Sequence, residues 1–470
     1  TSPFERSKLL MRWHELILEN AADLAVLITL EMGKTQREAM GEVVYGAAFI
    51  EWSAEEAKRI HGETMQPPFP NSRGWTIHQP VGVVACITPW NFPNAMITRK
   101  CAPALAAGCT MVIKPAPETP LSALALAELA RRAGIPDGVF NVICGDAQTL
   151  GPVMTGAPEV KMIGFTGSTA VGKLLMRQAA DGVKRVALEL GGNAPFIVMD
   201  DADIEAAADG VIASKFRVSG QTCVSANRII VQSSIADRFV AALEARVSKL
   251  KPGDGFDGAS DLGPLIHHEA VARVDALVRN ARESGARIVT GGRPLVDELG
   301  GAFYAPTLIE GGNPTMDLAC FEIFGPVASI YRLDSEEEIL RLANDTPWRQ
   351  CADGRFGVDA VWRHEGIGHW PRGRQMGCRG VLRAQIRAPR RCGGMSADRQ
   401  KTLAAAAALA YVEEGMTLGL GSGSTAEIFV RLLGERIKDG LRIQAVATSN
   451  QTAELAREVG VPLIDVDHVN

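Results

Sequence analysis

The sequence predicts an α/β fold built on parallel sheets. Short apolar runs at residues 82–87, 110–114 and 138–143 have the length of buried strands, and stretches with helical spacing lie between them. Buried strands that alternate with helices pair in parallel through right-handed crossovers. The chain has 470 residues, of which 46% are hydrophobic, so it is long enough for two or more domains with sizeable cores.

Composition argues against several classes of protein. The formal charge is −5 and the charges are interspersed as far as Pro347, so we expect neither nucleic acid nor a membrane as a partner. No apolar run approaches the roughly 20 residues of a membrane span, and the first residues do not resemble a signal peptide, which predicts a cytoplasmic protein. The nine cysteines form no C-x-x-C pair and the eight histidines no cluster, so no disulfide framework and no metal site are expected.

The first element is expected to be helical. From residue 5 to about 60 the pattern is amphipathic, with Leu10, Trp13, Leu16 and Ile17 at helical spacing. We interpret this stripe as a face packed on the core. The strands that follow create a nucleotide-binding architecture, in which ligands bind beyond the carboxyl ends of the strands.

Three candidates lie at those strand ends. Asn91 follows the first strand, and its amide can donate to a developing oxyanion or can cap the next helix. Lys114 ends the second strand, where its charge can meet a ribose or phosphate. Residues 163–168 read IGFTGS, which closes a strand and opens a helix, so backbone N–H groups face an anion or simply form a capped helix start.

Two further candidates could carry covalent chemistry. Glu189 follows the short strand 186–188, and a carboxylate there can act as a general base or can be simply solvated. Residues 216–223 read FRVSGQTC, in which Cys223 is a candidate nucleophile with Arg217 as a positive neighbour. The alternative for a lone cysteine is a buried small apolar side chain.

Together these stretches resemble a known family. Residues 88–93 (TPWNFP), 188–193 (LELGGN), 216–223 and 321–327 (FEIFGPV) resemble, in order, the motifs of aldehyde dehydrogenases, and the resemblance runs over about 5–347. It implies a Rossmann-type NAD(P)-binding domain followed by an α/β catalytic domain. The boundaries that we expect are 1–190 and 191–347.

The resemblance implies the roles of individual residues. Cys223 attacks an aldehyde, Asn91 and the Cys223 N–H hold the oxyanion, hydride passes to NAD or NADP, and Glu189 activates the water that hydrolyses the thioester. The implied cofactor-binding residues are Trp90, Lys114, Gly164, Thr166, Gly167, Ser168, Glu322 and Phe324. The choice between NAD and NADP stays open at this stage.

The substrate is expected to be succinate semialdehyde. Residues 194–198 (APFIV) and the pair Phe216 and Arg217 resemble the succinate-semialdehyde branch of the family. Arg99 and Arg217 match the positions that clamp the distal carboxylate in that branch. Each arginine is alternatively a structural ion-pair partner.

The pattern of the family stops after Pro347. Residues 348–394 contain ten arginines and no lysine, which would suit a basic nucleic-acid tail. Read one nucleotide downstream, however, residues 360–381 permit PFGGMK followed by ASGIGREGGKWGVEEY, which resembles the carboxyl-terminal motif of aldehyde dehydrogenases. We therefore interpret 348–394 as a frame-shifted, partly deleted C-terminal part. Such relatives are homo-oligomers, and the oligomerisation strand is expected to be lost.

A third pattern begins at Met395. Residues 417–425 read TLGLGSGST, a strand, a glycine-rich loop and a helix start that can cradle an anion. With 448–452 (TSNQT) this segment resembles the amino-terminal part of ribose-5-phosphate isomerase, so a partial α/β domain is expected over 395–470. The implied phosphate-binding residues are Ser422, Gly423, Ser424 and Thr425.

Two alternatives accompany this assignment of the C-terminal part. The segment lacks the catalytic motif of the isomerase family, so isomerisation is not expected, and the glycine-rich turn can also be a turn without a ligand. A chain with a damaged C-terminal part can also be an inactive chimera that retains at most nucleotide or sugar-phosphate binding.

Overall fold

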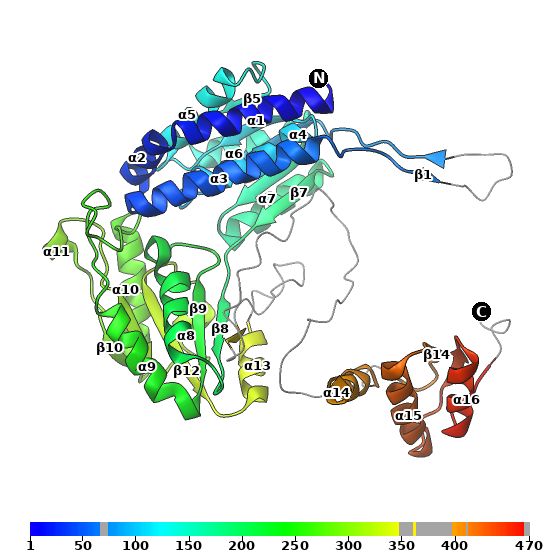
Figure 1. Cartoon of the computed structure of the whole chain (residues 1–470). Coiled ribbons are helices and arrows are strands. Elements are labelled where there is room, and N and C mark those ends of the chain that lie inside the picture. Colours follow the sequence, from blue (N-terminus) through cyan, green and yellow to red (C-terminus); the bar gives the residue numbers. More distant parts are fainter. Residues whose placement is uncertain (66–73, 347–360, 363–396, 410–411, 465–470) are drawn as a thin grey trace. The chain divides into compact units, whose positions relative to one another are not determined.

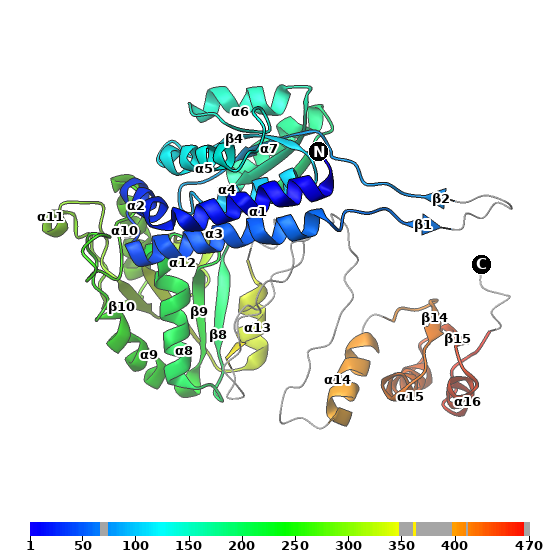
Figure 2. The same cartoon turned by 45° about the horizontal axis from the view of Figure 1, so that its top comes forward.

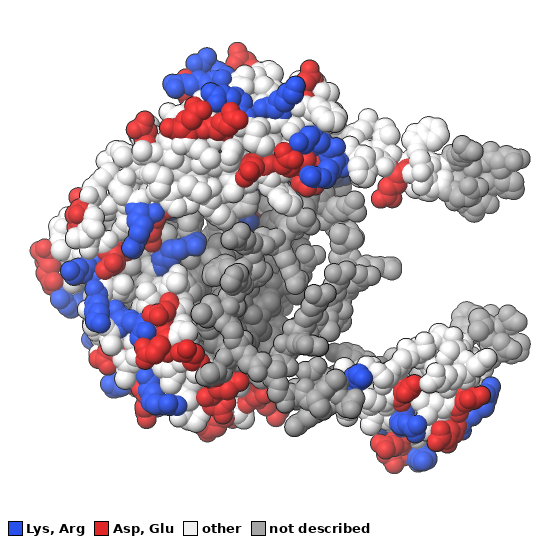
Figure 3. Space-filling model, in the orientation of Figure 1, with Lys and Arg blue, Asp and Glu red and all other residues white. Residues whose placement is uncertain are grey.

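The computed structural model describes residues 1–65, 74–346, 361–362, 397–409 and 412–464. The chain consists of two compact units, Thr1–Cys378 and Arg379–Asn470 (Figure 1). No helix in these described ranges is long and apolar enough to cross a membrane. On the face of the described chain that Figure 3 shows, acidic and basic side chains are interspersed.

Three helices begin the first unit. They are α1 (Pro3–Glu19), α2 (Ala21–Met32) and α3 (Gln36–Ala57), and α1 lies beside α3 in Figures 1 and 2. Helix α1 begins at a capping box formed by Ser2 and Glu5. The predicted apolar stripe is confirmed, because its four side chains are at most 8% exposed and lie in one core cluster.

The first sheet has five parallel strands in the order β5-β4-β3-β6-β7. The strands are β3 (Val83–Ile87), β4 (Thr110–Lys114), β5 (Phe140–Val142), β6 (Val160–Thr166) and β7 (Arg185–Glu189). The helices between them are α4 (Ala95–Ala106), α5 (Pro120–Arg132), α6 (Ala147–Gly156) and α7 (Thr169–Asp181). The predicted parallel sheet with helical crossovers is therefore confirmed. The strand order reverses between β3 and β6, which puts a ligand site at the carboxyl ends of these strands.

The second sheet has six strands in the order β10-β11-β12-β9-β8-β13, all parallel except the antiparallel pair β10 and β11. The strands are β8 (Ala194–Val198), β9 (Ala226–Gln232), β10 (Arg287–Thr290), β11 (Thr307–Glu310), β12 (Val327–Leu333) and β13 (Val361–Trp362). The longer helices are α8 (Ile204–Val211), α9 (Ser233–Val247), α10 (His268–Glu283) and α13 (Glu336–Asn344). Two single-turn helices are α11 (Val296–Leu299) and α12 (Asp317–Cys320). The first sheet ends at Glu189 and the second begins at Ala194, while the exact domain boundaries stay a prediction.

A narrow antiparallel hairpin leaves the first unit after α3. It consists of β1 (Thr64–Met65) and β2 (Gly74–Trp75), and it projects away from the helices in both views (Figures 1 and 2). The frame-shifted stretch proposed for 348–394 lies outside the described residues, apart from the two residues of β13.

The second unit is a small parallel α/β structure. Its elements are α14 (Ala397–Leu409), β14 (Thr417–Leu420), α15 (Ser424–Lys438), β15 (Gln444–Ala447) and α16 (Asn450–Glu458). Strands β14 and β15 pair in parallel, and Leu420, Val430, Leu433 and Ala445 are buried in a core of their own. The strand, glycine-rich loop and helix that the sequence predicted at 417–425 are present.

Candidate active site

The loop before Cys223 is tightly held. A π-helical turn (Ile212–Phe216) is followed by a 3₁₀ turn (Arg217–Gly220) in which Val218 and Ser219 are left-handed, with φ of 52° and 53°. A Cβ on Gly220 would lie 2.1 Å from the carbonyl oxygen of Gly325, and φ is +74°. Glycine is therefore required here by the protein backbone.

Three charged side chains, two carboxylates and one arginine, lie within electrostatic range of the Cys223 thiol. Burial raises the pKa of this thiol, and Glu322 and Glu189 raise it further, whereas Arg99 lowers it. The positive neighbour is thus Arg99, where the sequence suggested Arg217. Glu189 is the expected base, and Arg99 is one of the two expected substrate-binding arginines. Both lie within electrostatic range of Cys223.

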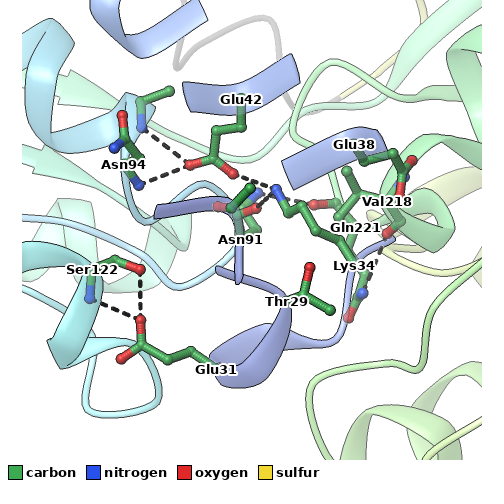
Figure 4. Close-up of polar contacts among 12 residues, drawn as sticks. Thr29, Glu31, Lys34, Glu38, Glu42, Asn91, Asn94, Ser122, Val218 and Gln221 are labelled. Carbon is green, nitrogen blue, oxygen red and sulfur yellow. Dashed lines mark hydrogen bonds and ion pairs between the residues drawn. The ribbon is translucent and has the colours of Figure 1, made fainter. Parts of the chain in front are cut away.

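Asn91 is tied to the nucleophile loop. Its side chain is buried, and its Nδ2 donates to the carbonyl oxygen of Gln221 at 2.9 Å (Figure 4). A side-chain amide has two N–H groups, so one remains for a ligand. The N-cap of α4 is Asn94, and its side chain forms no capping hydrogen bond, so the alternative that Asn91 caps this helix is wrong.

Glu189 ends β7 in a partly buried position. It lies within electrostatic range of both Cys223 and Lys100. Burial lowers the pKa of Lys100, and the negative charge of Glu189 opposes this shift. The sequence analysis did not single out Lys100, although its place beside Arg99 on α4 was a usable signal. The role of Glu189 as a general base stays a prediction.

Buried polar side chains lie at the strand ends of the first sheet. Lys114 is 2% exposed and donates to the carbonyl oxygen of Pro115 at 3.1 Å. The hydroxyl groups of Thr88 and Thr166 are buried and have no hydrogen-bond partner among the described residues. Buried polar groups without protein partners are expected where a polar ligand binds. This edge therefore fits the ribose and phosphate groups of a dinucleotide.

The predicted turn at 163–168 has mixed roles. Ser168 caps α7, with its hydroxyl accepting the N–H of Val171. A Cβ on Gly164 would lie 2.5 Å from Cys86 Sγ, and one on Gly167 would lie 2.5 Å from the Phe165 ring. Packing therefore disfavours a larger residue at both positions, and the contact of these glycines with a cofactor stays a prediction.

Glu322 and Phe324 lie in the short segment between α12 and β12. Glu322 Oε1 accepts the N–H of Gly192 at 3.2 Å, and burial raises the pKa of Glu322 to about 7. The rings of Phe324 and Trp90 meet edge to face, with centroids 5.6 Å apart, and both line a small pocket. Phe324 has φ of 50°, a strained conformation of the kind found at functional sites.

A buried lysine was missed by the sequence analysis. Lys215 is fully buried, and its Nζ has no hydrogen-bond partner in the described part of the chain. Burial lowers its pKa to about 7, while Glu322 opposes the shift. Its position in an otherwise ordinary helical pattern gave no signal in the sequence.

The two candidate substrate arginines lie on aromatic rings. The guanidinium of Arg99 lies 5.2 Å from the centre of the Phe49 ring, and that of Arg217 lies 5.2 Å from the centre of the Phe92 ring. Arg217 is exposed and forms no ion pair with a described residue, so the structural ion-pair alternative is not favoured for it. Phe92 adjoins Asn91, which places Arg217 beside the catalytic loop.

Comparisons with known proteins agree with this arrangement. The pattern of the Aldehyde dehydrogenase family matches residues 1–352. The succinate semialdehyde dehydrogenase of Acinetobacter baylyi is 51% identical over 348 residues, which are 74% of this chain and 72% of that protein. The NADP(+) succinate-semialdehyde dehydrogenase GabD of Escherichia coli is 53% identical over 348 residues, again 74% and 72%.

Another relative has a different name, and a crystal structure shows the same fold. The 3-sulfolactaldehyde dehydrogenase of Pseudomonas putida is 53% identical over 364 residues, 77% of this chain and 73% of that protein. The crystal structure of succinate-semialdehyde dehydrogenase from Burkholderia pseudomallei is 52% identical in sequence and superimposes with a TM-score of 0.72. The match covers 74% of this chain and 71% of that chain. The chain therefore belongs to the aldehyde dehydrogenase family, whose reaction is the NAD(P)-dependent oxidation of an aldehyde.

Proposed function

We propose that the chain oxidises succinate semialdehyde to succinate, with NAD or NADP as the acceptor, through a covalent bond to Cys223. The observation that carries the proposal is the grouping of Cys223 with Glu189 and Arg99, while Asn91 is tied to the nucleophile loop. This grouping supplies a nucleophile, a base, an anion-binding group and an oxyanion donor in one place.

The residues of the chain divide the work as follows. Cys223 Sγ bonds to the aldehyde carbon, and the amide of Asn91 with the N–H of Cys223 stabilises the resulting oxyanion. The bound cofactor supplies the hydride acceptor. Because burial raises the pKa of the thiol, its proton must be removed before attack, and we assign this step to Glu189, one of two carboxylates in electrostatic range. Glu189 releases this proton to solvent and, as a carboxylate again, takes a proton from the water that hydrolyses the thioester.

The substrate class follows from charge. The relatives are named for succinate semialdehyde, 3-sulfolactaldehyde and, in Pseudomonas aeruginosa, glutarate semialdehyde, all aldehydes with an anionic group at the far end. Arg99 and Arg217 are the cations beside the catalytic loop that suit such a group. We therefore propose that both arginines bind the distal carboxylate.

The test is the rate of NAD(P)H formation, followed by absorbance, with succinate semialdehyde, glutarate semialdehyde and uncharged butanal. We expect the highest kcat/KM with succinate semialdehyde and no turnover with Cys223→Ala. Turnover that persists in Cys223→Ala would reject the nucleophile, and equal kcat/KM for butanal would reject the anionic substrate class.

We propose separately that 348–394 is a frame-shifted end of the family domain and that 395–470 is a partial isomerase-like domain. The parallel β14-α15-β15 unit supports the second part, because Ser422 and Gly423 lie between the end of β14 and the start of α15, and Ser424 and Thr425 are the first two residues of that helix. The nucleotide sequence across codons 345–396 tests the first part, because an uninterrupted frame supported by independent reads would contradict it. We also propose that the glycine-rich turn binds phosphate, that the protein is cytoplasmic and that the oligomerisation strand is lost. An inactive chimera is the outcome if the soluble chain shows no turnover.

A further inference from the structure

A fully buried ion pair lies beside the candidate oxyanion donor. Lys34 Nζ is 2.5 Å from Glu42 Oε2, and neither side chain is exposed (Figure 4). Lys34 Nζ also lies 4.0 Å from the centre of the Phe92 ring. Burying two charges is expensive, and apolar replacements are often equally stable. The pair is therefore poorly explained by stability alone.

The remaining hydrogen bonds of the pair hold the segment that carries Asn91. Lys34 Nζ donates to the backbone carbonyl oxygen of Asn91 at 2.9 Å. Glu42 Oε1 accepts the N–H groups of Asn94 at 2.8 Å and Ala95 at 3.1 Å. One carboxylate thus caps α4, whose own N-cap side chain forms no capping bond. The pair fixes both ends of the short connection from Asn91 to α4.

The same helix holds the nucleophile loop. Glu38 lies one turn before Glu42 on α3, and its Oε1 accepts the N–H of Val218 at 2.6 Å. Val218 is left-handed, a conformation that is unfavourable for a β-branched residue. The loop then reaches Gln221, whose carbonyl oxygen accepts the Asn91 amide. The beginning of α3 therefore contacts both segments that would form the oxyanion site (Figure 4).

We propose that Lys34, Glu42 and Glu38 are positioning residues for the oxyanion-binding groups. They set the distance between the Asn91 amide and the Cys223 loop. Lys34 and Glu42 are fully buried and so do not contact the substrate, and Glu38 acts through its bond to Val218. This inference rests on the proposed function, because it takes Asn91 as the oxyanion donor. It assigns a catalytic purpose to a buried pair at the start of α3.

The test compares two reactions of the same thiol in the full-length chain. Acylation of Cys223 by p-nitrophenyl acetate passes through an oxyanion and needs no cofactor, whereas alkylation by iodoacetamide displaces iodide and forms no oxyanion. Both rates are measured by mass spectrometry on the peptide that contains Cys223, so that other cysteines do not contribute. The ratio of the two rates reports the oxyanion site alone.

We expect Lys34→Met to lower the ratio of acylation to alkylation roughly 10- to 100-fold. Lys58→Met is the matched control, because Lys58 directly follows α3 and forms an exposed ion pair with Glu55. This variant should leave the ratio unchanged. In an Asn91→Ala background, Lys34→Met should lower the ratio no further. An unchanged ratio in the single variant, or an additive loss in the double variant, would overturn the proposal.

A second pair of variants covers the case in which Lys34→Met does not fold. Glu38 is only partly buried, and Glu38→Ala removes the acceptor of the Val218 N–H, so the ratio should fall. Glu38→Gln keeps an acceptor oxygen and should restore the ratio to within about twofold. Equal falls for alanine and glutamine would overturn the positioning role.

The outcomes also separate this inference from the proposed function. A chain that oxidises no aldehyde, yet shows the expected loss of ratio in Lys34→Met, contradicts the proposed function and supports the positioning role. If the chain oxidises succinate semialdehyde and Lys34→Met leaves the ratio of acylation to alkylation unchanged, the proposed function is supported and the positioning role is contradicted. If Cys223 of the unaltered chain is acylated no faster than other thiols, both are overturned.

Discussion

Arg217 lies over the Phe92 ring at the edge of the catalytic loop, exposed to solvent. If its guanidinium binds the distal carboxylate, Arg217→Ala should raise KM for succinate semialdehyde roughly tenfold, because a charge-assisted hydrogen bond is lost. KM for butanal should change little. Steady-state kinetics with both aldehydes measure this difference.

The matched control is Arg132→Ala, which removes an arginine from an exposed pair with Glu128 on α5. It should leave both KM values unchanged. A similar rise in KM for both aldehydes in Arg217→Ala would show that the arginine shapes the pocket without recognising charge.

Lys215 provides a prediction about pH. Burial lowers its pKa from 10.5 to about 7, so between these values the unfolded chain binds a proton that the folded chain does not. The free energy of unfolding should therefore rise with pH across this window. Lys215→Met should remove this contribution to the slope and should be more stable at pH 7 by about 1 to 3 kcal/mol.

Urea unfolding of both proteins between pH 7 and about 9.5 measures this. Lys249→Met, which changes an exposed lysine just after α9, is the control and should keep the slope of the unaltered chain. Equal slopes for the unaltered chain and Lys215→Met would mean that the buried amine stays charged.

Single residues differ in how far the sequence could predict them. Cys223, Asn91 and Glu189 stand at strand ends or in glycine-rich turns, and such local patterns are visible in the sequence. Lys34 lies in the short connection between α2 and α3, and Lys215 lies in a π-helical turn. Their burial depends on contacts with distant segments, such as the bond from Lys34 to Asn91. Tertiary contacts of this kind leave no local signal.

At the scale of elements, α4 and α5 share an unusual form of capping. The N-cap side chains Asn94 and Thr119 form no capping bonds. Glu42 caps α4, and Glu31 at the end of α2 caps α5 by accepting the N–H groups of Leu121 and Ser122 (Figure 4). The sequence predicts helices between the strands, yet the carboxylates that cap these two helices lie 52 and about 90 residues away along the chain.

Glu31→Ala should therefore lower the free energy of unfolding by about 1 to 2 kcal/mol, because two N–H groups and the Ser122 hydroxyl lose their acceptor. Glu31→Gln keeps an acceptor and should lose less. Chemical denaturation measures both values. Glu55→Ala, which removes an exposed glutamate from α3, is the control, and a loss as large as that of Glu31→Ala would contradict the capping role.

At the scale of the molecule, the candidate site gathers groups from three parts of the first unit. Asn91 and Glu189 come from the first sheet, and Cys223 and Glu322 come from segments that flank strands of the second sheet. The connection between α2 and α3 holds the first part through the bond from Lys34 to Asn91, and α3 holds the second part through the bond from Val218 to Glu38. The alternation of strands and helices predicted each sheet, whereas the sequence pattern alone did not show which groups meet across them.

The second unit has its own core, in which Leu433 is fully buried. Leu433→Ala should destabilise that unit by about 2 to 5 kcal/mol and leave the turnover of succinate semialdehyde unchanged, because the candidate active site lies wholly in the first unit. Leu243→Ala is the matched control, since Leu243 is equally buried on α9 and packs in the core of the second sheet. It should lower the temperature at which turnover is lost, which Leu433→Ala should not. Calorimetry and the residual activity after heating measure both effects. If Leu433→Ala loses turnover at a temperature where the first unit stays folded, turnover depends on the second unit and the prediction is wrong.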